Sequence, residues 1–212
     1  LKNTVMPRLH NGHADFSADN ISDDIFRDIN RVVVTACGTA MHAGLVGRHL
    51  IESMLRIPVT VELSSEFRYM NPILDDHTLV IVVTQSGETA DSLAALRLAN
   101  ERGAKTISIV NVKGSSIARE SDYVLYTHAG PEIAVASTKA FSVQCAGMYL
   151  IALKLAEINH MMTEEEMAQY CEAFQTAIDT VAPVLEMDAQ IKDIAEKIKD
   201  TFSAFYLGRS LD

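Results

Sequence analysis

The sequence predicts an α/β protein, a three-layer αβα sandwich with a five-stranded parallel sheet and further helices towards the C-terminus. Two observations support this prediction. Short runs rich in valine, isoleucine and threonine alternate with stretches of helical periodicity, which is typical of a parallel sheet covered by helices on both faces. The 212 residues, 48% of them hydrophobic, are also enough to bury one sizeable core. We expect right-handed crossovers between the strands.

The elements follow one another regularly after a polar, irregular start. Residues 1–30 are interpreted as an interdomain linker or arm, with a short helix at 23–29. The expected strands are 32–36, 59–63, 79–83, 106–110 and 123–126. The expected helices are 41–56, 65–69, 88–102, 115–120 and 137–158, with Gly103 as a C-cap of the third. Residues 31–160 therefore form the predicted sheet domain.

The chain becomes helical beyond residue 158, and residues 161–200 are interpreted as a helical connection. Thr163 and Glu166 have the spacing of a capping box, which favours a helix start over paired catalytic carboxylates. An isoleucine stripe at 191, 194 and 198 indicates packing. Residues 202–209 resemble a new strand and turn, so 201–212 are expected to begin a second α/β domain. The chain therefore looks like a piece of a longer protein.

Composition restricts the class of partner and the compartment. The net charge of -10 argues against nucleic acid or an anionic membrane as a partner. Three scattered cysteines do not make a disulfide framework, and we expect Cys145 and Cys171 to fill the core. The chain has no signal-peptide core, and no apolar run approaches the roughly 20 residues that span a bilayer. A cytoplasmic protein fits these features.

The most informative stretch is residues 84–91, with the sequence TQSGETAD, between an expected strand and an expected helix. The free N–H groups and positive dipole end of that helix favour an anion such as phosphate. Thr84, Gln85, Ser86 and Thr89 add side-chain donors, and Gly87 permits close approach of the backbone. Since cations are scarce here, we expect selection by geometry and a small phosphorylated metabolite.

The same stretch also fits an ordinary capped helix. Ser86 or Thr89 can accept hydrogen bonds at the helix start, while Glu88 and Asp91 complement the dipole. Ligands in parallel α/β folds bind at the carboxyl ends of the strands, where this turn lies. Its position favours ligand binding over capping alone.

A second polar turn, Cys37-Gly38-Thr39, follows the first expected strand and opens the next helix. A helix N-terminus lowers a thiol pKa, so a nucleophilic Cys37 is one hypothesis. Because no histidine is placed to act as its base, binding through the backbone is favoured.

A third segment, residues 130–141, joins the last strand to the long helix. Ser137 and Thr138 fit a cap. Lys139 in the first turn is disfavoured by the helix dipole unless an anion is near, which points towards function.

Two other motifs are weaker. His10 and His13 lie close enough for a metal, but without further ligands a solvent-facing pair is favoured and no metal is predicted. The turn at residues 111–116 fits either a phosphate contact or a capped loop.

With these motifs the chain resembles a sugar isomerase (SIS) domain, a flavodoxin-like fold, and most closely the first isomerase lobe of the glutamine–fructose-6-phosphate aminotransferases. The matching segments are 36–39, 65–69, 84–91, 114–116 with 119–122, and 135–141; residues 8–13 and 207–209 also match. Two departures are Ala40, where the family often has serine, and Thr84, where it usually has serine.

The resemblance implies an enzyme that converts fructose 6-phosphate and glutamine to glucosamine 6-phosphate and glutamate without a cofactor. Thr84, Gln85, Ser86 and Thr89 would bind the sugar phosphate. The sugar contacts implied are Cys37, Gly38, Thr39, Val135, Ser137 and Lys139.

The resemblance also implies partners. A glutaminase domain would precede residue 1, and a second SIS lobe with the catalytic groups would follow residue 212, so no catalytic residue is assigned here. A homodimer is implied. The alternatives are a sugar-phosphate-binding regulator without chemistry and a deglycase acting on sugar-phosphate amines.

Overall fold

A five-stranded parallel sheet forms the centre of the molecule, in a computed structural model that describes residues 1–133 and 137–209. The strands are β3 (Arg31–Ala36), β4 (Val59–Leu63), β5 (Thr78–Thr84), β6 (Lys105–Val110) and β7 (Tyr123–Tyr126), in the spatial order β4-β3-β5-β6-β7. All neighbouring pairs are parallel. The predicted fold class and all five strands are confirmed.

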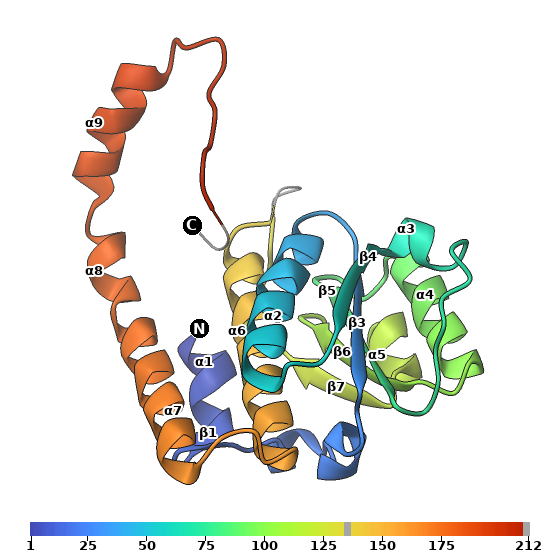
Figure 1. Cartoon of the computed structure of the whole chain (residues 1–212). Helices are drawn as coiled ribbons and strands as arrows, with labels where there is room; N and C mark the ends of the chain where they lie inside the picture. The colour runs from blue at the N-terminus through green and yellow to red at the C-terminus, as the bar shows by residue number, and fades with distance from the viewer. Residues whose placement is uncertain (134–136, 210–212) are drawn as a thin grey trace. The chain divides into compact units, whose positions relative to one another are not determined.

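Helices cover both faces of this sheet, as Figure 1 shows. Helices α2 (Thr39–Leu55) and α6 (Lys139–Ile158) lie together on one face. Helices α3 (Ser64–Phe67), α4 (Ala90–Glu101) and α5 (Ser116–Glu120) cover the other. Burial on both faces makes the central strand β5 apolar, with every residue buried, whereas the edge strands β4 and β7 are partly exposed.

Close approach of α2 and α6 depends on a small residue. A Cβ atom on Gly47 of α2 would meet three side-chain atoms of Met148 on α6, the nearest at 2.1 Å. The two helices therefore pack closely at this point, which holds the middle of α6 against α2.

The N-terminal segment is more ordered than the predicted arm. It holds α1 (Lys2–Val5), the 3-10 helices η1 (Met6–Arg8), η2 (Ser17–Asp19) and η3 (Asp23–Phe26), and a hairpin of β1 (Leu9–His10) and β2 (His13–Ala14). Phe16 and Phe26 are fully buried, and Arg8 bonds to Asp19 and to the carbonyl of Tyr126. Burial of these scattered apolar residues against α6 and β7 orders a segment whose composition looked irregular.

Helix α6 is long and apolar enough to cross a bilayer by length and composition, contrary to the expectation that no such run exists. In this fold it is a core helix, because 67% of its most apolar window is buried inside the protein. Burial against α2 and the sheet explains its apolar character.

The chain divides into two compact units, residues 1–171 and 172–212. Helix α7 (Glu164–Asp179) begins in the first, and α8 (Val181–Leu185) and α9 (Asp188–Ile198) belong to the second. The predicted capping box is confirmed: Thr163 N donates to Glu166 Oε2 at 2.9 Å, and Glu166 N donates to Thr163 Oγ1 at 3.2 Å.

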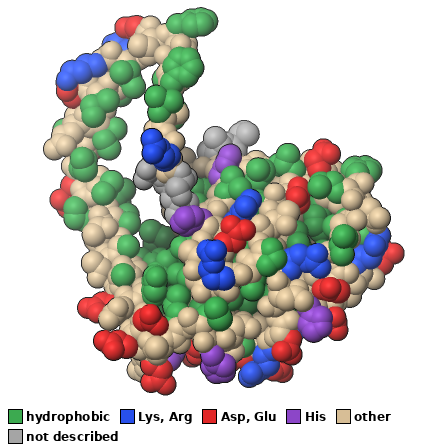
Figure 2. All heavy atoms as spheres, viewed as in Figure 1, with side chains coloured by type: hydrophobic (Ala, Val, Ile, Leu, Met, Phe, Trp, Pro, Cys, Tyr) green, Lys and Arg blue, Asp and Glu red, His purple; other side chains and the backbone are tan. Residues whose placement is uncertain are grey.

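Two predictions for the second unit differ from the structure. The isoleucine stripe of α9 is exposed, with Ile194 at 57%, and Figure 2 shows hydrophobic side chains along this unit. Residues 202–209 form no strand within the described part of the chain, and Tyr206 is 98% exposed. A strand needs a neighbour for its hydrogen bonds, and an apolar stripe needs a surface to cover it.

Candidate functional site

Two neighbouring strands bring the predicted turns together. Ala36 at the end of β3 lies opposite Val83 of β5, so the turns that follow these strands are side by side. Between them is a cleft of about 220 Å³, called here the strand-end cleft. It is lined by Cys37, Gly38, Thr39, Ala40, Val83, Thr84, Gln85, Ser86, Thr89, Ser92, Ser137 and Gln144. Eight of the ten predicted binding residues are among them.

The turn after β5 is built by its own hydroxyl groups. Thr84 Oγ1 accepts from Gly87 N, and Ser86 Oγ accepts from Glu88 N, each at 3.2 Å. Gly87 has φ +69°, and a Cβ atom there would lie 1.9 Å from Ser115 Oγ. Only glycine fits this backbone and this space.

Helix α4 starts at this turn without a side-chain cap. Thr89 is its N-cap residue, and the Thr89 side chain makes no capping hydrogen bond. Glu88 does not serve α4 either: its carboxylate accepts from Ser116 N at 2.8 Å and from Ser116 Oγ at 2.7 Å, at the start of α5. These two bonds lower the pKa of Glu88. The start of α4 thus keeps its positive dipole end and the Thr89 hydroxyl beside the cleft.

Helix α2 begins at the same cleft in the same way. Gly38, with φ +58°, is its N-cap and offers no side chain, and Thr39 is the first helical residue. Space around Gly38 is open, since a Cβ atom there would meet nothing within 4 Å. Two helix N-termini without side-chain caps therefore converge on one cleft, an arrangement suited to an anion.

Behind the cleft, buried hydroxyl groups connect the layers. Ser92 Oγ donates to Ser64 Oγ at 3.0 Å, and Ser64 Oγ is 3.0 Å from Thr35 Oγ1. Ser92 Oγ also lies 3.8 Å from Cys37 Sγ. This chain of contacts fixes the half-buried Cys37 as part of the wall.

The segment before α6 contributes less than predicted. Ser137 lines the cleft, but Lys139 is exposed at the first position of α6 and is not among the lining residues. Val135 lies outside the described residues. The anion that offsets Lys139 belongs to the chain: Glu132 Oε2 accepts from Ala140 N at 3.0 Å and from Thr138 N at 3.4 Å. The roles of Val135 and Lys139 stay predictions.

Ser92 and Gln144 also line the cleft, and the sequence reasoning missed both. Gln144 is 2% exposed, and its Oε1 atom has no hydrogen-bond partner within the described ranges. The signal for it was a lone amide among apolar residues of the long helix. Without the fold, that position did not point to the cleft.

Other candidates from the sequence are already satisfied. Asn111 Oδ1 accepts from Thr127 Oγ1 and from Ala129 N, so the start of the turn at 111–116 is bonded to the segment that follows β7. Burial raises the pKa of Cys145 to about 11 and also raises that of Cys171, which agrees with core positions.

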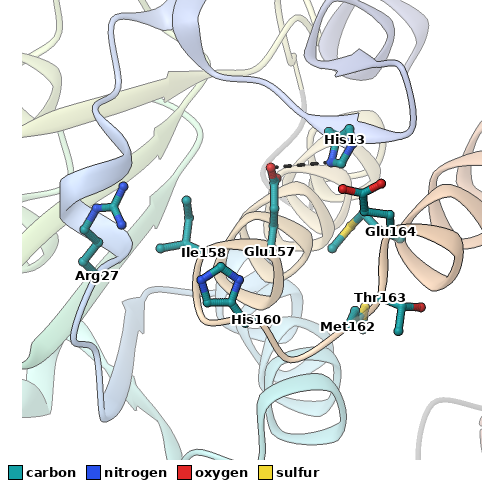
Figure 3. Close-up of a pocket in the computed structure, with 9 residues that line it drawn as sticks. His13, Arg27, Glu157, Ile158, His160, Met162, Thr163 and Glu164 are labelled. Carbon is teal, nitrogen blue, oxygen red and sulfur yellow. Dashed lines mark ion pairs between the residues drawn. The ribbon is translucent and has the colours of Figure 1, made fainter.

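A larger cleft, of about 300 Å³, lies at the other end of α6 and is shown in Figure 3. It is lined by His13, Arg27, Glu157, Ile158, His160, Met162, Thr163, Glu164 and Met167. His13 and Glu157 point toward each other, 3.5 Å apart, and Glu157 also contacts Lys154. Arg27 pairs with Asp24. Because Arg27 precedes β3, this cleft lies at the amino ends of the strands, where such folds do not bind ligands.

Comparisons with known proteins agree with this geometry. Residues 25–154 match the SIS domain family. The chain is 49% identical to a glutamine--fructose-6-phosphate aminotransferase [isomerizing] of Clostridium tetani, covering 100% of this chain and 35% of that protein. It is 45% identical to the corresponding protein of Symbiobacterium thermophilum, with the same coverage.

A solved structure gives the same result. The C-terminal domain of glucosamine-fructose-6-phosphate aminotransferase from Francisella tularensis superposes with a TM-score of 0.92 at 34% identity, covering 99% of this chain and 59% of that one. The chain spans about a third of the length of the curated relatives it matches. On the family match and the shared fold, this chain belongs to the SIS domain family.

Proposed function

We propose that this chain is the phosphosugar-binding isomerase lobe of an enzyme that converts fructose 6-phosphate and glutamine to glucosamine 6-phosphate and glutamate. The observation that carries the proposal is the convergence of the α2 and α4 N-termini, both without side-chain caps, on a cleft lined by hydroxyl groups. Oriented N–H groups and hydroxyls bind a phosphate monoester without a cluster of cations. The relatives are named for glutamine, fructose 6-phosphate and an isomerising amino transfer, which is the reaction proposed here.

In this proposal Thr84, Gln85, Ser86 and Thr89 hold the phosphate. The Thr84 hydroxyl accepts from Gly87 N and, like that of Ser86, which accepts from Glu88 N, keeps its own proton to donate. Ser86 and Thr89 can donate their hydroxyl protons to phosphate oxygens. Cys37, Gly38, Thr39, Val135, Ser137 and Lys139 complete the set on the sugar side.

The size of the strand-end cleft supports a shared site. Its volume of about 220 Å³ is below the roughly 300–1,000 Å³ typical of complete small-molecule pockets. We infer that a second SIS lobe closes the site and brings the catalytic groups, while a glutaminase domain supplies ammonia. The domain boundaries in this proposal are 1–30 for the connection from the glutaminase domain, 31–160 for the SIS domain, 161–200 for the helical connection and 201–212 for the start of the second lobe.

Titration of the full-length gene product tests the proposal. Fructose 6-phosphate, glucosamine 6-phosphate and inorganic phosphate are compared by calorimetry at equal ionic strength, followed by an assay of glucosamine 6-phosphate formed with and without glutamine. We expect saturable binding of both hexose phosphates, tighter than phosphate, and glutamine-dependent product. Hexose phosphate binding without any product would instead favour the regulator or, with release of ammonia from glucosamine 6-phosphate, the deglycase. No hexose phosphate binding would overturn the proposed site.

The proposal includes a homodimer and a cytoplasmic location. Light scattering at micromolar concentration is expected to give twice the monomer mass, and a monomer would contradict the dimer. The three free cysteines fit a reducing compartment. Fractionation of the native cells, with the protein found outside the cytoplasm, would contradict the location.

A further inference from the structure

Gln144 is a buried polar side chain whose bonding the fold leaves incomplete. It lies on α6, is 2% exposed, lines the strand-end cleft, and its Oε1 atom has no partner within the described residues. Buried polar atoms are almost always hydrogen-bonded, and one that is not costs stability. An amide oxygen that borders a cleft and lacks a partner is therefore suited to a ligand.

The residues around Gln144 offer its side-chain oxygen no hydrogen-bond donor within the described ranges. Val143 and Ala146, close to it on α6, are buried and apolar, and its Oε1 atom bonds to no other element within the described ranges. By contrast, Ser92 in the same cleft is used internally, since it bonds to Ser64. Among the buried side-chain atoms of the described residues that line this cleft, Gln144 Oε1 is the one without a partner.

The chemistry of the acceptor identifies which part of a ligand it faces. A phosphate monoester at neutral pH offers acceptor oxygens, and the donors proposed to match them are at the α4 N-terminus and on Ser86 and Thr89. An amide oxygen needs a donor, and the hydroxyl groups of a sugar are donors. Gln144 is the sixth residue of α6, about 7–8 Å along the helix from its first residue. This places it below the rim of the cleft.

We propose that Gln144 is a specificity-determining residue of the strand-end cleft, accepting a hydrogen bond from a hydroxyl group of the sugar and so separating polyhydroxylated phosphate esters from phosphate itself. This inference rests on the proposed function of the cleft. It adds a buried side-chain acceptor for a sugar hydroxyl to the sugar-side residues already proposed.

The substitution Gln144→Met tests this role, because methionine keeps the length and volume and removes the acceptor. Fructose 6-phosphate and inorganic phosphate are titrated by calorimetry into the full-length gene product of wild type and variant. We expect affinity for fructose 6-phosphate to fall about five- to tenfold, with phosphate affinity changed less than twofold. The melting temperature without ligand should stay the same or rise, since an unpaired buried oxygen is lost. A structural role of Gln144 would lower it.

Gln169→Met is the matched control, because Gln169 is exposed on α7 and far in sequence from the cleft residues. It should leave both affinities unchanged. Unchanged fructose 6-phosphate affinity in Gln144→Met, or an equal loss for phosphate, would overturn the role of Gln144 while leaving the proposed function intact. Wild-type protein that binds phosphate but not fructose 6-phosphate would overturn both.

Discussion

The starts of α4 and α6 form an instructive contrast. Both helices follow a strand and have a threonine as N-cap residue, and in neither does that threonine make a capping bond. At α6 the Glu132 carboxylate accepts from Ala140 N and Thr138 N, so the chain supplies its own anion. At α4 the Glu88 carboxylate is bound to α5 instead, and Asp91 in the first turn pairs with Arg68 at 3.9 Å.

The difference shows how a fold keeps an anion site open. A capping carboxylate at α4 would fill the position proposed for the phosphate. Glu88 is bonded to Ser116 instead, so it does not cap the positive dipole end of α4. Residue type before the helix does not separate the two cases; the position of one carboxylate does. In the proposed function, the helix start without a capping carboxylate is the one that binds the phosphate.

The largest effect on binding is expected when the two hydroxyl groups before α4, those of Ser86 and Thr89, are removed. In Ser86→Ala with Thr89→Ala, each lost hydrogen bond to a charged phosphate should cost about 1.5–3 kcal/mol of binding free energy. Calorimetry with fructose 6-phosphate measures this loss, and thermal melting checks that the fold survives. Unchanged affinity would place the phosphate elsewhere. Ser203→Ala, on an exposed residue, serves as the control.

The next effect concerns the glycine that shapes the α4 turn. Gly87→Ala puts a side chain at φ +69° and against Ser115, and should lower the free energy of unfolding by about 2–4 kcal/mol. Urea denaturation measures it. Gly103→Ala is the matched control, because Gly103 has φ +76° with nothing within 4 Å, so only the backbone cost applies. Equal losses of unfolding free energy in the two variants would mean that the contact with Ser115 adds nothing to the cost of Gly87→Ala.

A smaller effect is expected where the chain supplies its own anion. Glu132→Gln removes the charge at the start of α6 and should lower the free energy of unfolding by about 0.3–1 kcal/mol. Urea denaturation at low salt is the measurement, with Glu172→Gln in the middle of α7 as the control. A more stable Glu132→Gln variant would contradict the capping role.

The smallest effect is a pH dependence of the Glu88 contact. Hydrogen bonds from Ser116 lower the pKa of Glu88 from its usual 4.5, so the folded protein favours the charged carboxylate. Its contribution is therefore complete above pH 4.5 and is lost as the pH falls through the lowered value. Glu88→Gln should be less stable than wild type at pH 7, and the difference should shrink at acid pH. A difference that grows on acidification would reverse this assignment.

Much of the fold followed from local patterns. Five β-branched runs separated by helical periods predicted five parallel strands, and β4 and β7 were predicted to the residue. The polar turns after β3 and β5 were expected at one edge, because carboxyl ends of parallel strands share an edge. Their convergence in the strand-end cleft confirms that arrangement.

Other features depended on partners distant in the chain. The order of residues 1–30 comes from contacts such as that of Arg8 with Tyr126, 118 residues away. The local sequence does not indicate such contacts. Residues 202–209 have a strand-like composition but lack a neighbouring strand within the described chain. Composition indicates what a segment can form, and the partner determines whether it forms.

By itself the sequence determined the fold class, the strands and the turns that could hold a phosphate, since these rest on periodicity and on residue types next to one another. Only the tertiary structure decided that a carboxylate caps the start of α6 while Glu88 leaves the start of α4 uncapped. It also decided that Gln144 lines the cleft with an oxygen that has no partner within the described residues. Both outcomes depend on where a few side chains lie after the chain has folded. Capping by Glu88, for example, joins residues 28 positions apart, a distance over which local propensity carries no information.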